Sequence, residues 1–213
     1  MKEKHLAHLM KLLDDDSAVV RDSLKKEFAL FGPSLKNALA RLALPPTEKE
    51  RSIIQELLEE ERRLWLREHW DEWFGLKDGK KRLEKALSLL CEFQSNIIYP
   101  VSLTGLLDEL YAEYRRFYKE NNSRVLARFL FVEKGLKGAE QNYYHPLNSN
   151  PIYAVKEKRG IPITLVSVYI LVGRRAGLAI EGCNLPGHFM DRAMFEGKEF
   201  LVDCFHGGRF YNM

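Results

Sequence analysis

Residues 160–177 read GIPITLVSVYILVGRRAG, and this stretch decides the fold. Pro162 suits the first turn of a helix, because its φ is preset and its missing N–H would have no helical partner there. From that point apolar residues occupy nearly every side of the helix as far as Arg174 and Arg175. A helix that is apolar all round is a buried one. We therefore expect a buried central helix that ends at Gly177.

Three strand-like runs follow this helix. They read LAIEGCNL (178–185), HFMDRAMF (188–195) and EFLVDCF (199–205). The last two runs flank Glu196-Gly197-Lys198, which is typical of a hairpin turn. A succession of helices followed by a succession of strands is typical of the α+β class. The sequence therefore predicts an α+β fold in which the buried helix packs on a small antiparallel sheet.

The chain ahead of the central helix is predicted to be helical. Thr47 and Glu50 have the spacing of a capping box, in which each side chain bonds to the other residue's backbone amide. The helix that begins there is expected to end near Gly75. Residues 1–46 read as three short helices, and the acidic corner between the first two resembles one HEAT-type repeat. We predict two parts: a short helical segment, 1–46, which could dock a partner, and a domain formed by residues 47–213.

Composition narrows the class of protein. The 33 basic and 30 acidic residues leave a net charge of only +3, which gives no general affinity for polyanions. No run of 18 apolar residues occurs, and the first residues lack the apolar core of a secretory signal. The three cysteines form no C-x-x-C pair and no disulfide framework, which favours a reducing compartment. We expect a cytoplasmic protein, monomeric by default, that binds no nucleic acid, membrane or cofactor.

Several motifs of the last third match one known family. They are YYHPLNSNPIYAVKEKRG (143–160), the central helix, EGCNLPGHF (181–189) and LVDCFHGGR (201–209). In these motifs the chain resembles the bacterial transglutaminase-like family of the SirB type, from about residue 80 to 209. The resemblance implies a papain-like core. Proteins of this resemblance usually run on into further helices, so we expect the chain to be truncated at its C-terminus or to be an unusually short member.

The resemblance also implies site residues. In the wider superfamily a cysteine at the start of the buried helix attacks an amide carbonyl, a histidine activates it and an aspartate orients the imidazole. The histidine falls on His188 and the aspartate on Asp203. The cysteine position falls on Pro162, which carries no nucleophile. The nearest hydroxyl is that of Thr164, which would need strong activation and could instead bond to the backbone of the first helical turn.

Strand parity tests whether His188 and Asp203 can meet. Residues opposite each other in an antiparallel pair have a constant sum of residue numbers, and side chains alternate between the two faces. The two numbers sum to 391, so the pair shares a face only if the register sum is odd. A six-residue loop would place the two directly opposite each other, whereas a three-residue loop would place them on different faces. We predict the odd register.

Other residues of the matched motifs are candidates for the lining of the cleft. These are Asn148, Ser149, Gly187 and Cys183. Asn148 could donate to a bound group near His188, or it could form an Asx-type turn ahead of the next helix.

A cysteine or a metal could also supply chemistry. Cys183 could replace the missing thiol, whereas Cys204 should face away from Asp203. A metal site formed by Cys183, His188, Cys204 and His206 is the less favoured reading, because the spacing matches no zinc pattern. We therefore predict no metal site. The Gly207-Gly208-Arg209 run could form an anion-binding nest, although a plain turn is the favoured reading.

Two hypotheses about function follow. The favoured one is a non-catalytic binding or regulatory module for a protein or peptide, with His188 and Asp203 retained in a papain-type cleft. The alternative is an amide-bond hydrolase or acyl-transferase that uses Thr164 or Cys183. A hydroxyl or thiol within hydrogen-bond distance of His188 would favour the enzyme.

Overall fold

The computed structural model describes the backbone of residues 2–212 of the 213-residue chain, and the side chains within that range except those of residues 2, 3 and 80. The described chain forms two compact units. One comprises the residues up to Glu72 together with Ser95–Pro100, and the other comprises Trp73–Gln94 and the residues from Val101 onward. No helix within residues 2–212 has both the length and the apolar content that crossing a bilayer requires.

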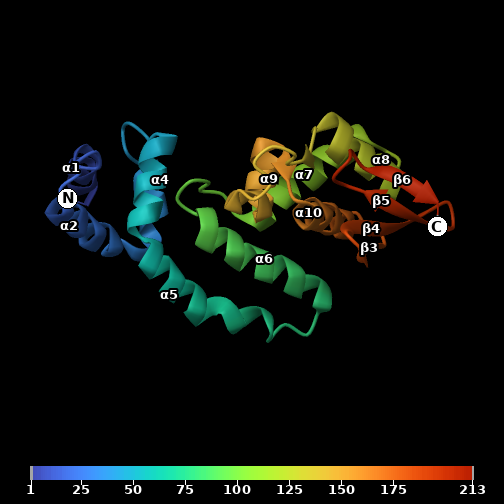
Figure 1. Ribbon diagram of the computed structural model, residues 1–213, viewed down its shortest axis with the longest axis horizontal. Helices are drawn as coiled ribbons and strands as arrows, with labels where there is room; N and C mark the ends of the chain where they lie inside the picture. The colour runs from blue at the N-terminus through green and yellow to red at the C-terminus, as the bar shows by residue number, and fades with distance from the viewer. Residues whose placement is uncertain (1, 213) are drawn as a thin grey trace. The chain divides into compact units, whose positions relative to one another are not determined.

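The first unit is built from helices. They are α1 (Lys2–Lys11), α2 (Ala18–Ala29), α3 (Leu35–Ala40), α4 (Glu48–Leu57) and α5 (Glu59–His69), with 3₁₀ turns at Gly32–Ser34 and Trp70–Trp73 (Figure 1). The capping box predicted at the start of α4 is present: the Thr47 side chain accepts from the Glu50 amide, and the Glu50 carboxylate accepts from the Thr47 amide. The helix expected to reach Gly75 is interrupted at Leu58, between α4 and α5.

One apolar core unites α1, α2, α3 and α4. Ile54 and Leu58 are buried in the same cluster as Leu6, Leu24 and other residues of α1, α2 and α3. Helix α4 therefore belongs with the segment before it. The structure divides near residue 72, whereas the sequence predicted a boundary between residues 46 and 47. The physical reason is that the apolar stripe of α4 packs on the N-terminal helices, which local periodicity cannot indicate.

The second unit contains the predicted α+β arrangement. Its helices are α6 (Gly79–Ser95), α7 (Leu103–Phe117), α8 (Ser123–Ala127), α9 (Pro151–Glu157) and α10 (Pro162–Arg175), with a π-helical segment at Arg128–Glu133 and a 3₁₀ turn at Pro146–Ser149. Two short strands, β1 (Lys137–Gly138) and β2 (Arg159–Gly160), pair in parallel. The fold class is α+β, as the sequence predicts.

Four antiparallel strands follow α10 in the order of the chain. They are β3 (Ile180–Leu185), β4 (His188–Phe195), β5 (Lys198–Asp203) and β6 (Arg209–Asn212), each paired with the next (Figure 1). The sequence predicts the first three but not β6, whose four residues lie beyond the Gly-Gly-Arg turn. Such a short strand carries little periodicity of its own, and it is held by its pairing with β5.

The predicted central helix, α10, is the core of this unit. Every residue from Thr164 to Gly173 is buried, and α10 packs against β3 and β4. A Cβ atom added at Gly182 would lie 3.8 Å from Cδ1 of Ile170, so the face of the sheet that carries Gly182 faces α10. Gly182 is paired with Asp191. By alternation the side chains of Asp191 and Val202 share that face, whereas His188 and Asp203 lie on the other one.

Candidate functional site

His188 is the first residue of β4 and follows a tight turn. Leu185 pairs with His188 across Pro186 and Gly187. Gly187 has a φ of +76°, which suits the third residue of a type II turn with proline at the second. Gly187 was expected to line the cleft. In the structure it forms the turn that places His188 at the start of the strand.

Asp203 ends β5 and lies close to His188. The hairpin pairs Phe195 with Lys198, and its register sum is 393, the odd parity that the sequence predicts. The connecting loop has two residues, Glu196 and Gly197. Asp203 therefore lies opposite position 190, two residues along β4 from His188 on the same face. His188 Nε2 lies 3.2 Å from Oδ2 of Asp203.

A second histidine completes the cluster. His206 Nδ1 lies 2.8 Å from the same Oδ2 of Asp203, and the other oxygen, Oδ1, accepts from the backbone amides of Phe205 and His206. Burial raises the pKa of Asp203, but the hydrogen bonds from the side chain and backbone of His206 and the proximity of His188 outweigh it. The pKa of Asp203 is therefore lower than usual, and its carboxylate is held ionised between two imidazoles.

Neither predicted nucleophile engages His188. Thr164 is 2% exposed, and its Oγ1 has no hydrogen-bond partner within the described residues. Cys183 is partly buried on β3 opposite Met190, and by alternation it shares the face of His188. Over residues 2–212, no thiol or hydroxyl forms a hydrogen bond with His188. The expected backbone hydrogen bond of the Thr164 hydroxyl does not form either.

Backbone hydrogen bonds bring the start of α10 towards Asp203. The amide of Gly138 donates to the carbonyl of Phe205 (2.9 Å), and the amide of Ala139 donates to the carbonyl of Gly160 (3.0 Å). Gly160 lies two residues before Pro162, and Phe205 lies two residues after Asp203. Strand β1 therefore connects the segment that carries Pro162 with the segment that follows the aspartate.

The predicted cleft residues Asn148 and Ser149 serve the loop that precedes α9. Asn148 is 2% exposed, and its Nδ2 donates to the carbonyls of Asn142 and Tyr143. Ser149 Oγ donates to the carbonyl of Pro146. Both amide protons of Asn148 are thus used within the protein, which corrects the expectation that it donates to a bound group. The Asx-type turn does not form at Asn148 either, because its side chain contacts residues five and six positions upstream. The side chain that accepts from amides two and three residues later is that of Asn150.

The face of the sheet towards α10 carries a separate buried pair. Cys204 Sγ donates to Oδ2 of Asp191 at 2.8 Å, and both residues are fully buried. Burial raises the pKa of Asp191 well above its usual value, and it raises that of the Cys204 thiol as well. Cys204 faces away from Asp203, as the sequence predicts. The zinc alternative that used Cys183 and Cys204 together is wrong, because the two cysteines lie on opposite faces of the sheet.

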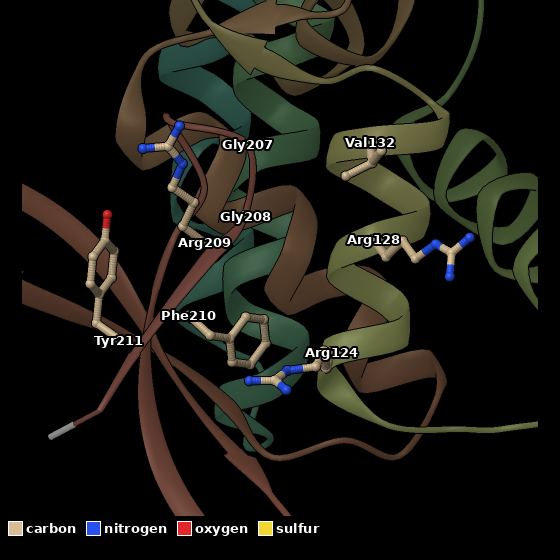
Figure 2. Close-up of a pocket in the computed structure, with 8 residues that line it drawn as sticks. All are labelled: Arg124, Arg128, Val132, Gly207, Gly208, Arg209, Phe210 and Tyr211. Atoms are coloured by element: carbon tan, nitrogen blue, oxygen red, sulfur yellow. The ribbon is translucent and has the colours of Figure 1, made fainter.

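Two hollows flank the Gly207-Gly208-Arg209 turn. One, of about 520 Å³, is lined by His206 together with Lys137, Gly138, Ala139, Glu140, Gln141, Arg159, Phe205, Gly207 and Arg209. The other is the open pocket of Figure 2, which contains three arginines. Figure 2 shows the guanidinium groups of Arg124, Arg128 and Arg209 pointing in different directions. They do not converge on one anion, and the Gly208 amide donates to the Asp203 carbonyl, which supports a plain turn.

His206 is the site residue that the sequence assigned only to the metal alternative. Its local signal is the spacing Asp203-x-x-His206 directly after a strand. That signal is weak, because the contact depends on a tight turn that brings the side chain back onto the carboxylate.

Comparisons with known proteins agree with this architecture. The profile of the family described as "Transglutaminase-like superfamily" matches residues 102–213, which is more than half of the chain. A "UPF0162 protein" of Xylella fastidiosa (strain Temecula1) is 34% identical over 120 residues, 52% of this chain and 43% of the relative. "F-box only protein 21" of Homo sapiens is 32% identical over 141 residues, 62% of this chain and 21% of the relative. The alignments thus span less than half the length of these relatives, and no solved structure matches the chain.

Proposed function

The chain belongs to the transglutaminase-like superfamily, and from that premise we propose that it is a binding or regulatory module of the SirB type whose cleft retains His188 and Asp203 but no nucleophile. One observation carries the proposal. Within the described residues no hydroxyl or thiol is hydrogen-bonded to His188, and the helix that begins at the nucleophile position of the superfamily begins here with Pro162.

The state of the thiols supports the same proposal. Burial raises the pKa of Cys91 to about 12, and it also raises that of Cys204. A thiol with a raised pKa is protonated at neutral pH and is a poor nucleophile. Cys183 is the one cysteine that is not buried, and nothing within residues 2–212 places a base on its sulfur. The expected ligand is a protein or peptide that fits the cleft beside His188.

Electrophilic probes test the absence of catalysis. A haloacetamide for thiols and a fluorophosphonate for hydroxyls are applied to the full chain, to His188→Ala and to His8→Ala, which replaces an exposed histidine of the first unit. We expect slow haloacetamide labelling of Cys183 at equal rates in all three proteins, and no fluorophosphonate labelling. Labelling of Thr164 or Cys183 that disappears in His188→Ala alone would overturn the proposal and establish the hydrolase or acyl-transferase.

A displayed peptide library tests the binding half of the proposal. Peptides selected on the wild-type chain are measured against His188→Ala and His8→Ala. We expect enriched peptides whose affinity falls at least about tenfold in His188→Ala and is unchanged in His8→Ala. Enrichment that does not depend on His188, or no enrichment, contradicts a binding role for this cleft.

A further inference from the structure

We infer that His188, Asp203 and His206 form a binding site for a divalent transition-metal ion. Each of the three residues offers one ligand atom, and these atoms all lie within 4.8 Å of one another. Two imidazoles and one carboxylate are a ligand set that suits Zn²⁺, Co²⁺, Fe²⁺ and Ni²⁺. The site goes beyond the proposed function and does not depend on it, because it requires only these three side chains.

The separations already approach those of a coordinated ion. Zinc lies about 2.0–2.2 Å from imidazole nitrogen and carboxylate oxygen, which sets neighbouring ligand atoms in a tetrahedral site about 3.4 Å apart. Oδ2 of Asp203 lies 2.8 Å from His206 Nδ1 and 3.2 Å from His188 Nε2. The two pairs would therefore have to open by about 0.6 Å and about 0.2 Å to reach coordination distances. The ligand atoms of the two histidines, which lie within 4.8 Å of each other, would have to close to the same separation.

The Nε2 atom of His188 is a buried polar atom that an ion could satisfy. This atom has no hydrogen-bond partner among residues 2–212, although Oδ2 of Asp203 is only 3.2 Å away. A hydrogen bond would require the N–H to aim at that oxygen. This nitrogen is therefore an orphaned polar group that an ion would satisfy.

The carboxylate is held for this role by its other oxygen. Oδ1 of Asp203 accepts from the amides of Phe205 and His206 at 3.1 Å each, which leaves Oδ2 directed at the two imidazoles. Such outer contacts fix the orientation of a metal ligand and are a usual part of metal sites. The Asp203 side chain is only 7% exposed, so the carboxylate is buried, whereas the His206 side chain is half exposed.

Three protein ligands leave at least one coordination position open, as in catalytic rather than structural zinc sites. His206 also lines the hollow of about 520 Å³ that contains Lys137, Arg159 and Arg209. A fourth ligand, either water or a group of a bound molecule, can approach from that side.

Metal titration of the full, untagged chain tests the site. Zn²⁺ binding to metal-free protein is measured by calorimetry, and Co²⁺ binding by its visible absorption, which reports the number and kind of ligands. We expect one ion per chain. His206→Ala and Asp203→Asn should each weaken binding by at least about a hundredfold and change the Co²⁺ spectrum. His8→Ala should bind as tightly as the wild type.

His206→Ala is the decisive variant, because its half-exposed side chain can be removed without opening the core, and circular dichroism checks that it folds. The inference is overturned if the wild type binds no ion, or if folded His206→Ala binds Zn²⁺ as tightly as the wild type. The outcome is separate from that of the probe labelling, since neither measurement depends on the other.

Discussion

Cys204, the residue after β5, donates its thiol hydrogen to Oδ2 of Asp191 in β4 at 2.8 Å, on the face of the sheet opposite to the one that carries Asp203. Two aspartates of one small sheet are therefore in contrasting states. Burial raises the pKa of Asp191 well above its usual value, whereas the bonds from His206 outweigh burial and lower the pKa of Asp203. The raised pKa of Asp191 affects how stability depends on pH, whereas the lowered pKa of Asp203 keeps its carboxylate ionised for binding a ligand.

Asp191→Asn should change how stability depends on pH. A carboxyl whose folded pKa is raised contributes its full stability below about pH 3.9 and loses it as pH rises towards the folded value. Asparagine cannot ionise, and it keeps an oxygen for Cys204. We expect the free energy of unfolding of the wild type, minus that of Asp191→Asn, to fall as pH rises from 4 to 7, by up to about 1.4 kcal/mol per unit. Urea titrations at several pH values measure it, and a constant difference would contradict the buried state of Asp191.

Thr164→Val should leave the protein at least as stable as the wild type. The Thr164 hydroxyl is buried with no partner among the described residues, so its removal relieves an uncompensated polar group and gains about 1 kcal/mol. Ser167→Ala is the matched control on the same helix, because the Ser167 hydroxyl donates to the carbonyl of Ile163 at 2.7 Å. It should lose up to about 1 kcal/mol in the same urea titration. A loss on Thr164→Val larger than on Ser167→Ala would show that the threonine hydroxyl has a partner.

Gly208→Ala should destabilise the protein more than Gly197→Ala. Both glycines have positive φ, +69° and +74°, which costs an alanine about 1 kcal/mol. A Cβ atom at Gly208 would also lie 2.5 Å from the ring of Phe131, whereas one at Gly197 meets nothing within 4 Å. We expect a further loss of about 1–3 kcal/mol at Gly208. Thermal unfolding of the two variants compares them, and equal losses would mean that Phe131 moves aside freely.

Thr47→Ala should weaken the first unit, whereas Ser17→Ala should not. Thr47 closes the capping box at the start of α4, and loss of such a cap costs about 1 kcal/mol. Ser17 stands at the same position before α2 but makes no side-chain hydrogen bond to that helix. Chemical denaturation of both variants should therefore separate them by about 1 kcal/mol. The same loss in both variants would mean that helix propensity, and not the cap, sets the cost.

Much of the fold follows from local patterns. The capping residues Thr47 and Asn150, the proline at the first turn of α10 and the unbroken apolar run behind it were readable, because each depends on residues within one or two turns of helix. Strand parity shows on paper which loop lengths let the pair share a face. The two-residue loop that gives the odd register is seen only in the structure. The family resemblance identified His188 and Asp203 as site residues, and in the structure His188 Nε2 lies 3.2 Å from Oδ2 of Asp203.

Tertiary structure decided the rest. The sequence could not indicate that α4 shares a core with α1 and α2, because an apolar stripe does not say which neighbour covers it. Nor could it place His206 on Asp203, or leave the Thr164 hydroxyl without a partner in the described part of the chain, because both depend on the path of the chain between elements. The residue types that form a site can thus be identified from the sequence. Whether they act as a nucleophile and base or as ligands for an ion depends on distances and directions that only the folded chain sets.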